Sequence, residues 1–175
     1  PIAEANDPNY KPYRRDEETL VRQWAIPGTE GLRHRIGGLE KTDIYGAVST
    51  EPLNHEKMVK YRKEKIDRLA NKLPLQEVFG DEKGELLVIS WGGTKGSVFT
   101  ATKELRKAGK DVSHAHFTNI NPLPKNTNEI LSNYKKILVC ELNSGQFANY
   151  LRMTHPKYEY MQYNKVQGLP FTVQE

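Results

Sequence analysis

Residues 85–109 read ELLVISWGGTKGSVFTATKELRKAG and contain three consecutive structural signals. The short aliphatic run Glu85 to Trp91 is bounded by polar residues, which is typical of a buried strand. A glycine-rich turn follows, and then four apolar residues recur at spacings of three, four and three, as on one helix face: Val98, Ala101, Leu105 and Ala108. Gly109 is placed to cap the end of that helix. The segment therefore predicts a strand–turn–helix unit.

The same alternation continues to the end of the chain. Further strands are predicted at Val112 to Phe117, Ile137 to Leu142 and about Tyr158 to Tyr163, with helical segments between them. Asn126, with Glu129 three residues on, predicts a capped start for the short helix after the second strand. Strands that are separated by helices favour right-handed crossovers and a mainly parallel sheet. We therefore predict an α/β fold, a three-layer α/β/α sandwich with its functional loops at the carboxyl ends of the strands.

The N-terminal part of the chain has a different pattern. Residues 1–54 show no sustained period and are interrupted by many Pro and Gly residues, which predicts an arm that lies on another part of a protein. Residues 55–74 predict a connecting amphipathic helix, capped by Asn54 and stopped by Pro74. Its narrow apolar stripe is Val59, Ile66, Ala70 and Leu73. The chain begins at Pro1 and its first Met is Met58, so we expect it to be part of a longer protein.

Composition excludes several classes of function. No apolar run approaches the roughly 18 residues that span a bilayer, and no signal segment opens the chain, so a soluble, cytoplasmic protein without membrane contact is expected. The net charge of +4 is spread evenly along the sequence, so nucleic-acid binding is not expected. Cys140 is the one cysteine, which rules out an internal disulfide or a four-thiolate metal site. Its apolar surroundings indicate a small buried hydrophobe.

Two motifs in the α/β part have both a chemical and a structural interpretation. The turn Gly92 to Ser97 lies where backbone N–H groups can bind a phosphate, but its spacing matches neither dinucleotide nor P-loop motifs. Glycine is also needed there for the turn itself. His114 and His116 lie on one strand face and could supply two metal ligands, yet no third is evident nearby. Packed, hydrogen-bonded histidines are the simpler interpretation.

Two further groups of polar residues are candidates for a site. Glu141 ends the third strand and could act as an acid or base, but it has no partner carboxylate or nucleophile. A structural role is favoured, in which it accepts hydrogen bonds from turn N–H groups or the next helix start. Arg33 and Arg35, on either side of His34, could bind a carboxylate substrate, although solvated or subunit-contact arginines are commoner.

Six segments, taken in order, resemble a known family. They are Trp24 to Thr29, His34 to Glu40, Trp91 to Gly96, His114 to His116, Asn121 to Pro124 and Tyr163 to Phe171. Together they are similar to the C-terminal region of the α subunit of 2-oxoglutarate:ferredoxin oxidoreductase, also called 2-oxoglutarate synthase. The resemblance covers nearly the whole chain.

The resemblance implies a fold and a set of cofactors. Residues 75–175 would form a transketolase C-terminal-like domain with a five-stranded sheet, whose first, antiparallel strand would be Leu75 to Phe79. Residues 1–54 would be the trailing edge of a thiamine-pyrimidine-binding domain. The intact enzyme would use thiamine diphosphate, Mg²⁺, a 4Fe–4S cluster and coenzyme A to convert a 2-oxoacid to an acyl-CoA, and would reduce ferredoxin. The family's β subunit holds the cluster and the pyrophosphate, so this chain is expected to bind no cofactor itself.

The chain is thus expected to assemble with the β subunit and the rest of the α subunit, and to contribute no catalytic residue. The candidate loop and interface residues are Gly92, Gly93, Thr94, Gly96, Asn121, Pro122, Glu141, Asn143, Gln146, Asn164, Lys165 and Gln167. Two alternatives stay open: a flavodoxin-like module that binds a nucleotide or flavin, and an α subunit of an enzyme that acts on pyruvate or branched 2-oxoacids.

Overall fold

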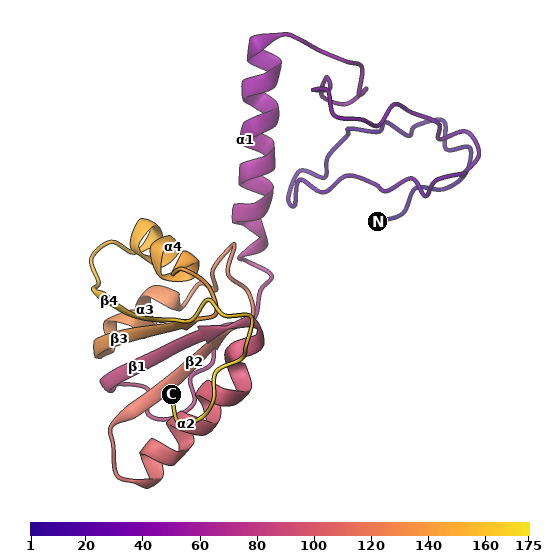
Figure 1. Cartoon of the computed structure of the whole chain (residues 1–175). Coiled ribbons are helices and arrows are strands. Elements are labelled where there is room, and N and C mark those ends of the chain that lie inside the picture. The colour runs from indigo at the N-terminus through magenta and orange to yellow at the C-terminus, as the bar shows by residue number, and fades with distance from the viewer. The chain divides into compact units, whose positions relative to one another are not determined.

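The computed structural model describes all 175 residues and divides into two compact units, Pro1–Lys72 and Leu73–Glu175 (Figure 1). The first unit consists of helix α1, Pro52–Leu69, and of irregular chain joined by isolated bridges such as Tyr13 to Ile44. Its buried apolar side chains are few: Ala3, Leu20, Leu32 and Met58. No helix of the chain has the length and apolar character needed to cross a membrane.

Helix α1 begins earlier than its sequence indicates. It starts at Pro52, where a residue without an N–H fits the first turn, and Glu51 is its N-cap. The expected capping by Asn54 is wrong, because the Asn54 amide donates to the Lys41 carbonyl at 2.9 Å. The apolar stripe also lies differently, since Val59 is 45% exposed while its neighbour Met58 is buried.

The second unit contains a four-stranded parallel sheet. Its strands are β1 (Gly84–Trp91), β2 (Val112–Phe117), β3 (Tyr134–Glu141) and β4 (Tyr160–Asn164), in the order β2-β1-β3-β4. The helices are α2 (Lys95–Lys107), α3 (Thr127–Ser132) and α4 (Gln146–Thr154), with a short 3-10 turn, η1 (Gly92–Thr94), before α2. Gly109 lies just past α2 with φ +78°, in the conformation that the predicted cap requires.

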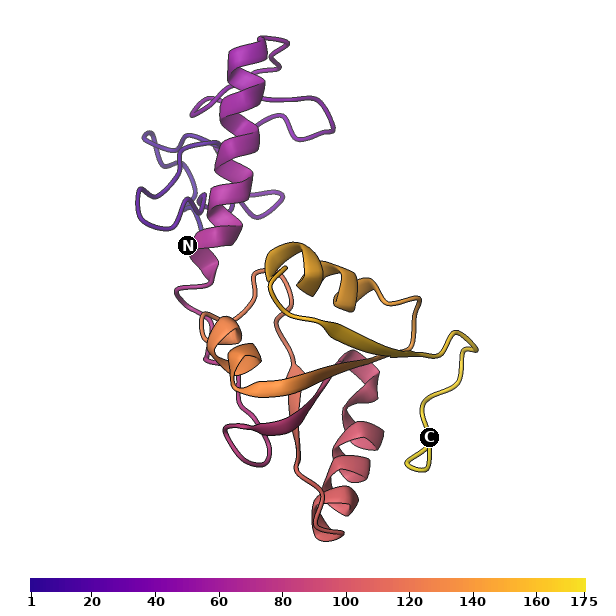
Figure 2. The same ribbon diagram turned by 90° about the vertical axis from the view of Figure 1, so that its left-hand side faces the viewer.

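Helices cover both faces of this sheet. The chain moves one way along the sheet from β1 to β2 and the other way from β2 to β4, so right-handed crossovers place α2 on one face and α3 and α4 on the other (Figures 1 and 2). The larger apolar cluster, which includes Leu87, Val139 and Phe147, lies between the sheet and α3 and α4. On the α2 side, Phe171 of the C-terminal tail joins Val88 and Val98. The predicted α/β fold is confirmed.

The expected fifth strand does not form. Only Phe79 bridges β2, through two backbone hydrogen bonds with His114. Three residues earlier, the N–H and carbonyl of Gln76 bond the side-chain amide of Asn126 at 2.8 and 2.9 Å. This amide takes the place of a strand partner, so Leu75 to Phe79 stays irregular. It also explains why Asn126 does not cap α3 with its side chain, as the sequence had predicted.

Candidate functional site

Glu141 joins the loops at the carboxyl edge of the sheet. Its side chain is fully buried, and Oε2 accepts hydrogen bonds from Trp91 Nε1 at 3.1 Å, Asn143 Nδ2 at 3.0 Å and the Phe147 N–H at 2.8 Å. Oε1 accepts from the Ala148 N–H at 2.9 Å. The carboxylate thus lies at the N-terminus of α4, where the helix dipole favours negative charge. With both oxygens bonded to these donors, Glu141 connects the ends of β1 and β3 to α4.

The turn after β1 is held by a threonine. Thr94 Oγ1 donates to the Trp91 carbonyl at 2.8 Å and accepts from the Trp91 N–H at 3.2 Å. Gly92 has φ +60°, a conformation that side-chain-bearing residues rarely adopt. Gly93 and Gly96 have open space where a Cβ would lie, so packing does not require glycine at either position. Of these three glycines, only Gly92 is therefore required by the backbone conformation of the turn.

The two other predicted loops, after β2 and after β3, both lie close to helix α4. Asn143 Oδ1 accepts from the Gln146 N–H at 2.9 Å at the start of α4. In the loop after β2, the Asn121–Pro122 peptide is cis, and Asn121 Oδ1 accepts from the hydroxyl of Tyr150 on α4 at 3.3 Å. The structure therefore brings the three predicted loops together around one edge, with α4 contacting two of them.

The tail after β4 is folded back on itself. Asn164 ends β4, and the next N–H, that of Lys165, donates to the Glu141 carbonyl at 3.0 Å. The Lys165 ammonium donates to both carboxylate oxygens of Glu175, at 2.8 and 3.0 Å, and lowers the pKa of Glu175 to about 2. The Lys165 charge is thus paired inside the tail, whereas Gln167 is exposed.

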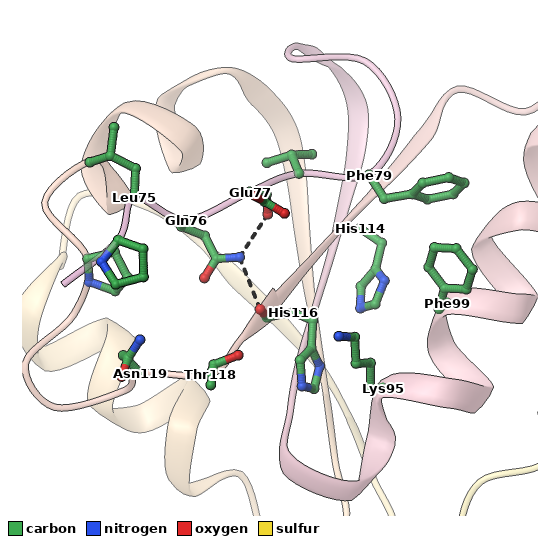
Figure 3. Close-up of a pocket in the computed structure, with 13 residues that line it drawn as sticks. Leu75, Gln76, Glu77, Phe79, Lys95, Phe99, His114, His116, Thr118 and Asn119 are labelled. Atoms are coloured by element: carbon green, nitrogen blue, oxygen red, sulfur yellow. Dashed lines mark hydrogen bonds between the residues drawn. The ribbon is translucent and has the colours of Figure 1, made fainter.

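A second polar cluster lies beside β2. A hollow of about 550 Å³ separates the Pro74 to Phe79 segment from the start of α2 and the end of β2 (Figure 3). Its lining includes Gln76, Lys95, Phe99, His116 and Thr118. The Gln76 amide donates to the His116 carbonyl at 3.0 Å, which satisfies one backbone acceptor on the free edge of β2.

One buried hydroxyl links the two histidines of this cluster. Ser90 Oγ, fully buried on β1, lies 2.7 Å from His114 Nε2 and 2.8 Å from His116 Nδ1. The strand register explains this, because Ser90 pairs with His116 in the parallel ladder. The imidazoles are packed and hydrogen-bonded, and no group of three or more His, Cys, Asp or Glu is placed to hold a metal ion.

The environment keeps both imidazoles neutral at pH 7. Burial lowers the pKa of His114 to about 4, and repulsion by a protonated His116 and by the Lys95 ammonium adds to the effect. Burial and Lys95 also lower the pKa of His116. Cys140, on the same face of the sheet, is buried, and burial raises the pKa of its thiol to about 11. The thiol therefore stays protonated and behaves as an apolar side chain.

The Arg33 to Arg35 segment lies in the first unit. Arg33 and His34 line a hollow of about 710 Å³ together with Arg22 and Trp24. Arg35 is exposed but is not part of this lining. Neither Arg33 nor Arg35 forms an ion pair, so the structure leaves both guanidinium groups available to a carboxylate.

Three residues of these sites were not predicted. Ser90, Gln76 and Asn126 each bond groups far away in the sequence, 24 to 50 positions apart. Ser90 did carry a signal, as the one hydroxyl in the aliphatic run of β1. Gln76 carried none, and Asn126 was predicted only as a helix cap, because the partners of both side chains are backbone groups of another segment.

Comparison with known proteins identifies relatives of the chain. No family model matches it. Its structure matches 2-oxoglutarate:ferredoxin oxidoreductase from Magnetococcus marinus, with 2-oxoglutarate, coenzyme A and succinyl-CoA bound, with a TM-score of 0.82 and 29% identity. The match covers 98% of this chain and 30% of that one. The α subunit of 2-oxoacid:ferredoxin oxidoreductase 1 from Aeropyrum pernix is 28% identical over 82% of the chain. Over nearly its whole length, the chain matches one part of the α subunits of the 2-oxoacid:ferredoxin oxidoreductases.

Within that family, the chain is similar to 2-oxoglutarate oxidoreductase subunit KorA of Mycobacterium tuberculosis. The two are 44% identical over 169 residues, which cover 95% of this chain and 25% of that subunit. The chain thus spans about a quarter of the length of this relative. The resemblance predicted from six sequence segments is confirmed, and the alternative of a nucleotide- or flavin-binding module is not favoured.

Proposed function

We propose that the protein containing this chain is the α subunit of a cytoplasmic 2-oxoacid:ferredoxin oxidoreductase that converts 2-oxoglutarate and coenzyme A to succinyl-CoA and carbon dioxide. Two electrons from each turnover would pass to ferredoxin. The observation that carries the proposal is the 44% identity with a 2-oxoglutarate oxidoreductase subunit over nearly the whole chain. The solved relative that the structure matches has 2-oxoglutarate, coenzyme A and succinyl-CoA bound.

In this enzyme the chain would serve assembly and would leave the chemistry to other parts. Thiamine diphosphate, when bound, supplies the carbanion chemistry of decarboxylation. The residues of this chain do not fit a 4Fe–4S cluster, because Cys140 is its one cysteine and is buried. We infer that the β subunit holds the cluster, Mg²⁺ and the pyrophosphate. The first unit would belong to the pyrimidine-binding domain of the α subunit.

Exposed apolar side chains support the assembly role. Several large ones in the first unit are between 44% and 80% exposed: Trp24, Ile26, Ile36, Leu39 and Leu53. Val166 and Leu169 of the tail are 68% and 60% exposed. Buried interface cores are enriched in such side chains, so these surfaces would contact the β subunit and the rest of the α subunit. The loops around Gly92, Asn121 and Asn143 would add polar contacts.

The experiment that tests this function uses the intact α and β subunits together. Ferredoxin reduction is measured with 2-oxoglutarate, pyruvate and a branched 2-oxoacid in the presence of coenzyme A. A kcat/KM highest for 2-oxoglutarate supports the proposal. A preference for pyruvate would instead favour an α subunit of a pyruvate:ferredoxin oxidoreductase. This candidate is reasonable because some relatives are named only as 2-oxoacid:ferredoxin oxidoreductases.

The arginine loop offers a sharper test of substrate choice. If Arg33 or Arg35 binds the distal carboxylate of 2-oxoglutarate, its replacement by Gln removes a charge-assisted hydrogen bond. We expect KM for 2-oxoglutarate to rise at least about tenfold, with the KM for pyruvate unchanged. Arg14→Gln is the matched control, because Arg14 is an exposed arginine of the same unit. Equal effects on both substrates would assign the loop to subunit contact.

A further inference from the structure

The hollow beside β2 combines a cationic side, an aromatic side and a polar side. Lys95 forms the cationic side, and Figure 3 shows its ammonium directed toward the space between His114 and His116. Phe79 and Phe99 form the aromatic side, with ring centroids 4.6 Å apart. Thr118 and Asn119 form the polar side. Such a mixture of apolar walls and a few converging polar groups is typical of a site for a small molecule.

The charges of the lining favour an anion at the cationic side. Lys95 makes no ion pair and no side-chain hydrogen bond, although ten other lysines and arginines of this chain pair with acids. The carboxylate of the lining is Glu77, on the irregular segment opposite α2, and it is exposed. His114 and His116 are neutral at pH 7, so the Lys95 charge is the one beside the imidazoles.

Proton counting shows how an imidazole can add a hydrogen bond to that charge. Ser90 is fully buried and its hydroxyl has two neighbours, His114 Nε2 and His116 Nδ1, so its one proton must point to one of them. When Ser90 donates to His116 Nδ1, His116 must carry its own proton on Nε2. His114 then donates its Nε2–H to Ser90. In this arrangement His116 can donate from Nε2 into the hollow.

We propose that this hollow binds a small organic anion, with a carboxylate or phosphate between Lys95 and His116 and an apolar body against Phe79 and Phe99. Binding selects the state in which His116 is protonated at Nε2 and, through Ser90, also fixes the tautomer of His114. The inference goes beyond the proposed enzyme activity, because no residue of this hollow has been given a part in that activity.

The test is a titration of the purified chain, labelled with ¹⁵N in histidine, with phenyl phosphate, phenylacetate and benzyl alcohol at pH 7.5. We expect the anions to bind at least about ten times more tightly than the neutral alcohol. The ¹⁵N shifts should show the His116 proton moving to Nε2. The tighter of the two anions identifies the head group. Since no turnover is measured, the outcome is independent of the proposed function.

Variants on α2 provide the matched comparison. Lys95→Met should weaken anion binding at least about tenfold, because it removes a charge-assisted hydrogen bond, whereas Lys103→Met on the same helix should have no effect. In Ser90→Ala, the His114 tautomer should no longer respond to the ligand. Three outcomes would overturn the proposal: equal binding of the alcohol, no binding of either anion up to about 10 mM, or a His116 proton on Nδ1 in the complex.

Discussion

At the scale of single residues, Glu141 shows how a buried charge can organise the edge of a sheet. Its carboxylate accepts hydrogen bonds from Trp91, Asn143 and two N–H groups of α4. Glu141→Gln replaces one acceptor oxygen by a donor, so buried N–H groups lose their partner. We expect the free energy of unfolding to fall by about 3 kcal/mol in urea titrations. Glu159→Gln, at an exposed position, is the control, and an equal loss there would contradict this role.

The pKa of His114 predicts a pH dependence of stability. Its folded pKa is about 4 and its unfolded pKa is about 6.5, so the unfolded state binds more protons between these values. The contribution of His114 to the free energy of unfolding is fully present above about pH 6.5, and up to about 3 kcal/mol of it is lost as the pH drops toward 4. Urea titrations across this range measure the loss. His114→Gln should flatten most of the dependence, and an unchanged slope in this variant would refute the assignment.

At the scale of elements, the sequence predicted most of the α/β unit and failed at one edge of it. Strong periodicity located β1, α2 and β3, because apolar residues at fixed spacing reflect burial of those same elements. The resemblance to the oxidoreductases implied a strand from Leu75 to Phe79, but this segment forms only the bridge between Phe79 and His114. Its pairing is decided by the Asn126 side chain, a contact between segments 50 residues apart that no local pattern encodes.

Asn126 therefore offers a test of this edge. Asn126→Ala removes two hydrogen bonds to the Gln76 backbone, which should destabilise the unit by about 1–2 kcal/mol. It should also speed hydrogen exchange at the Gln76 N–H. Lys125→Ala, one residue earlier and exposed, is the control. A longer ladder with β2 would instead slow exchange of the Glu77 N–H, which lies two residues before Phe79 and would face β2, and it would show that Asn126 keeps the segment from pairing.

The candidate site was predictable in outline at this scale, because parallel strands bring their carboxyl ends to one edge. The loops around Gly92, Asn121 and Asn143 do meet there. The hollow beside β2 was not predicted, although His114 and His116 were recognised as lying on one face. Gln76 and Phe79 line its other side, and they lie there because the segment from Leu75 to Phe79 is irregular and does not pair along β2 as a strand. Sequence periodicity assigns faces, but it does not report which distant segment covers them.

At the scale of the whole molecule, the two units differ in how much apolar surface they bury. The first buries four hydrophobic side chains, Ala3, Leu20, Leu32 and Met58, whereas one cluster of the second alone contains thirteen. Because apolar burial is the main favourable term in folding, the first unit should be much less stable. In native-state hydrogen exchange, amides of residues 1–72 should lose protection at lower urea than those of β1 and β3.

Met58 separates independent unfolding from a single cooperative transition. Met58→Ala removes a buried side chain from the first unit and should lower its stability by about 2–3 kcal/mol, while Val59→Ala, at a position that is 45% exposed, should cost much less. If the units unfold separately, exchange in the sheet of the second unit should be the same in both variants. A matching loss of protection at Leu87 and Val139 in Met58→Ala would mean that the 175 residues unfold as one body. The stability of the first unit would then come from the chain itself, and covering of its exposed apolar side chains by another subunit would not be needed to explain it.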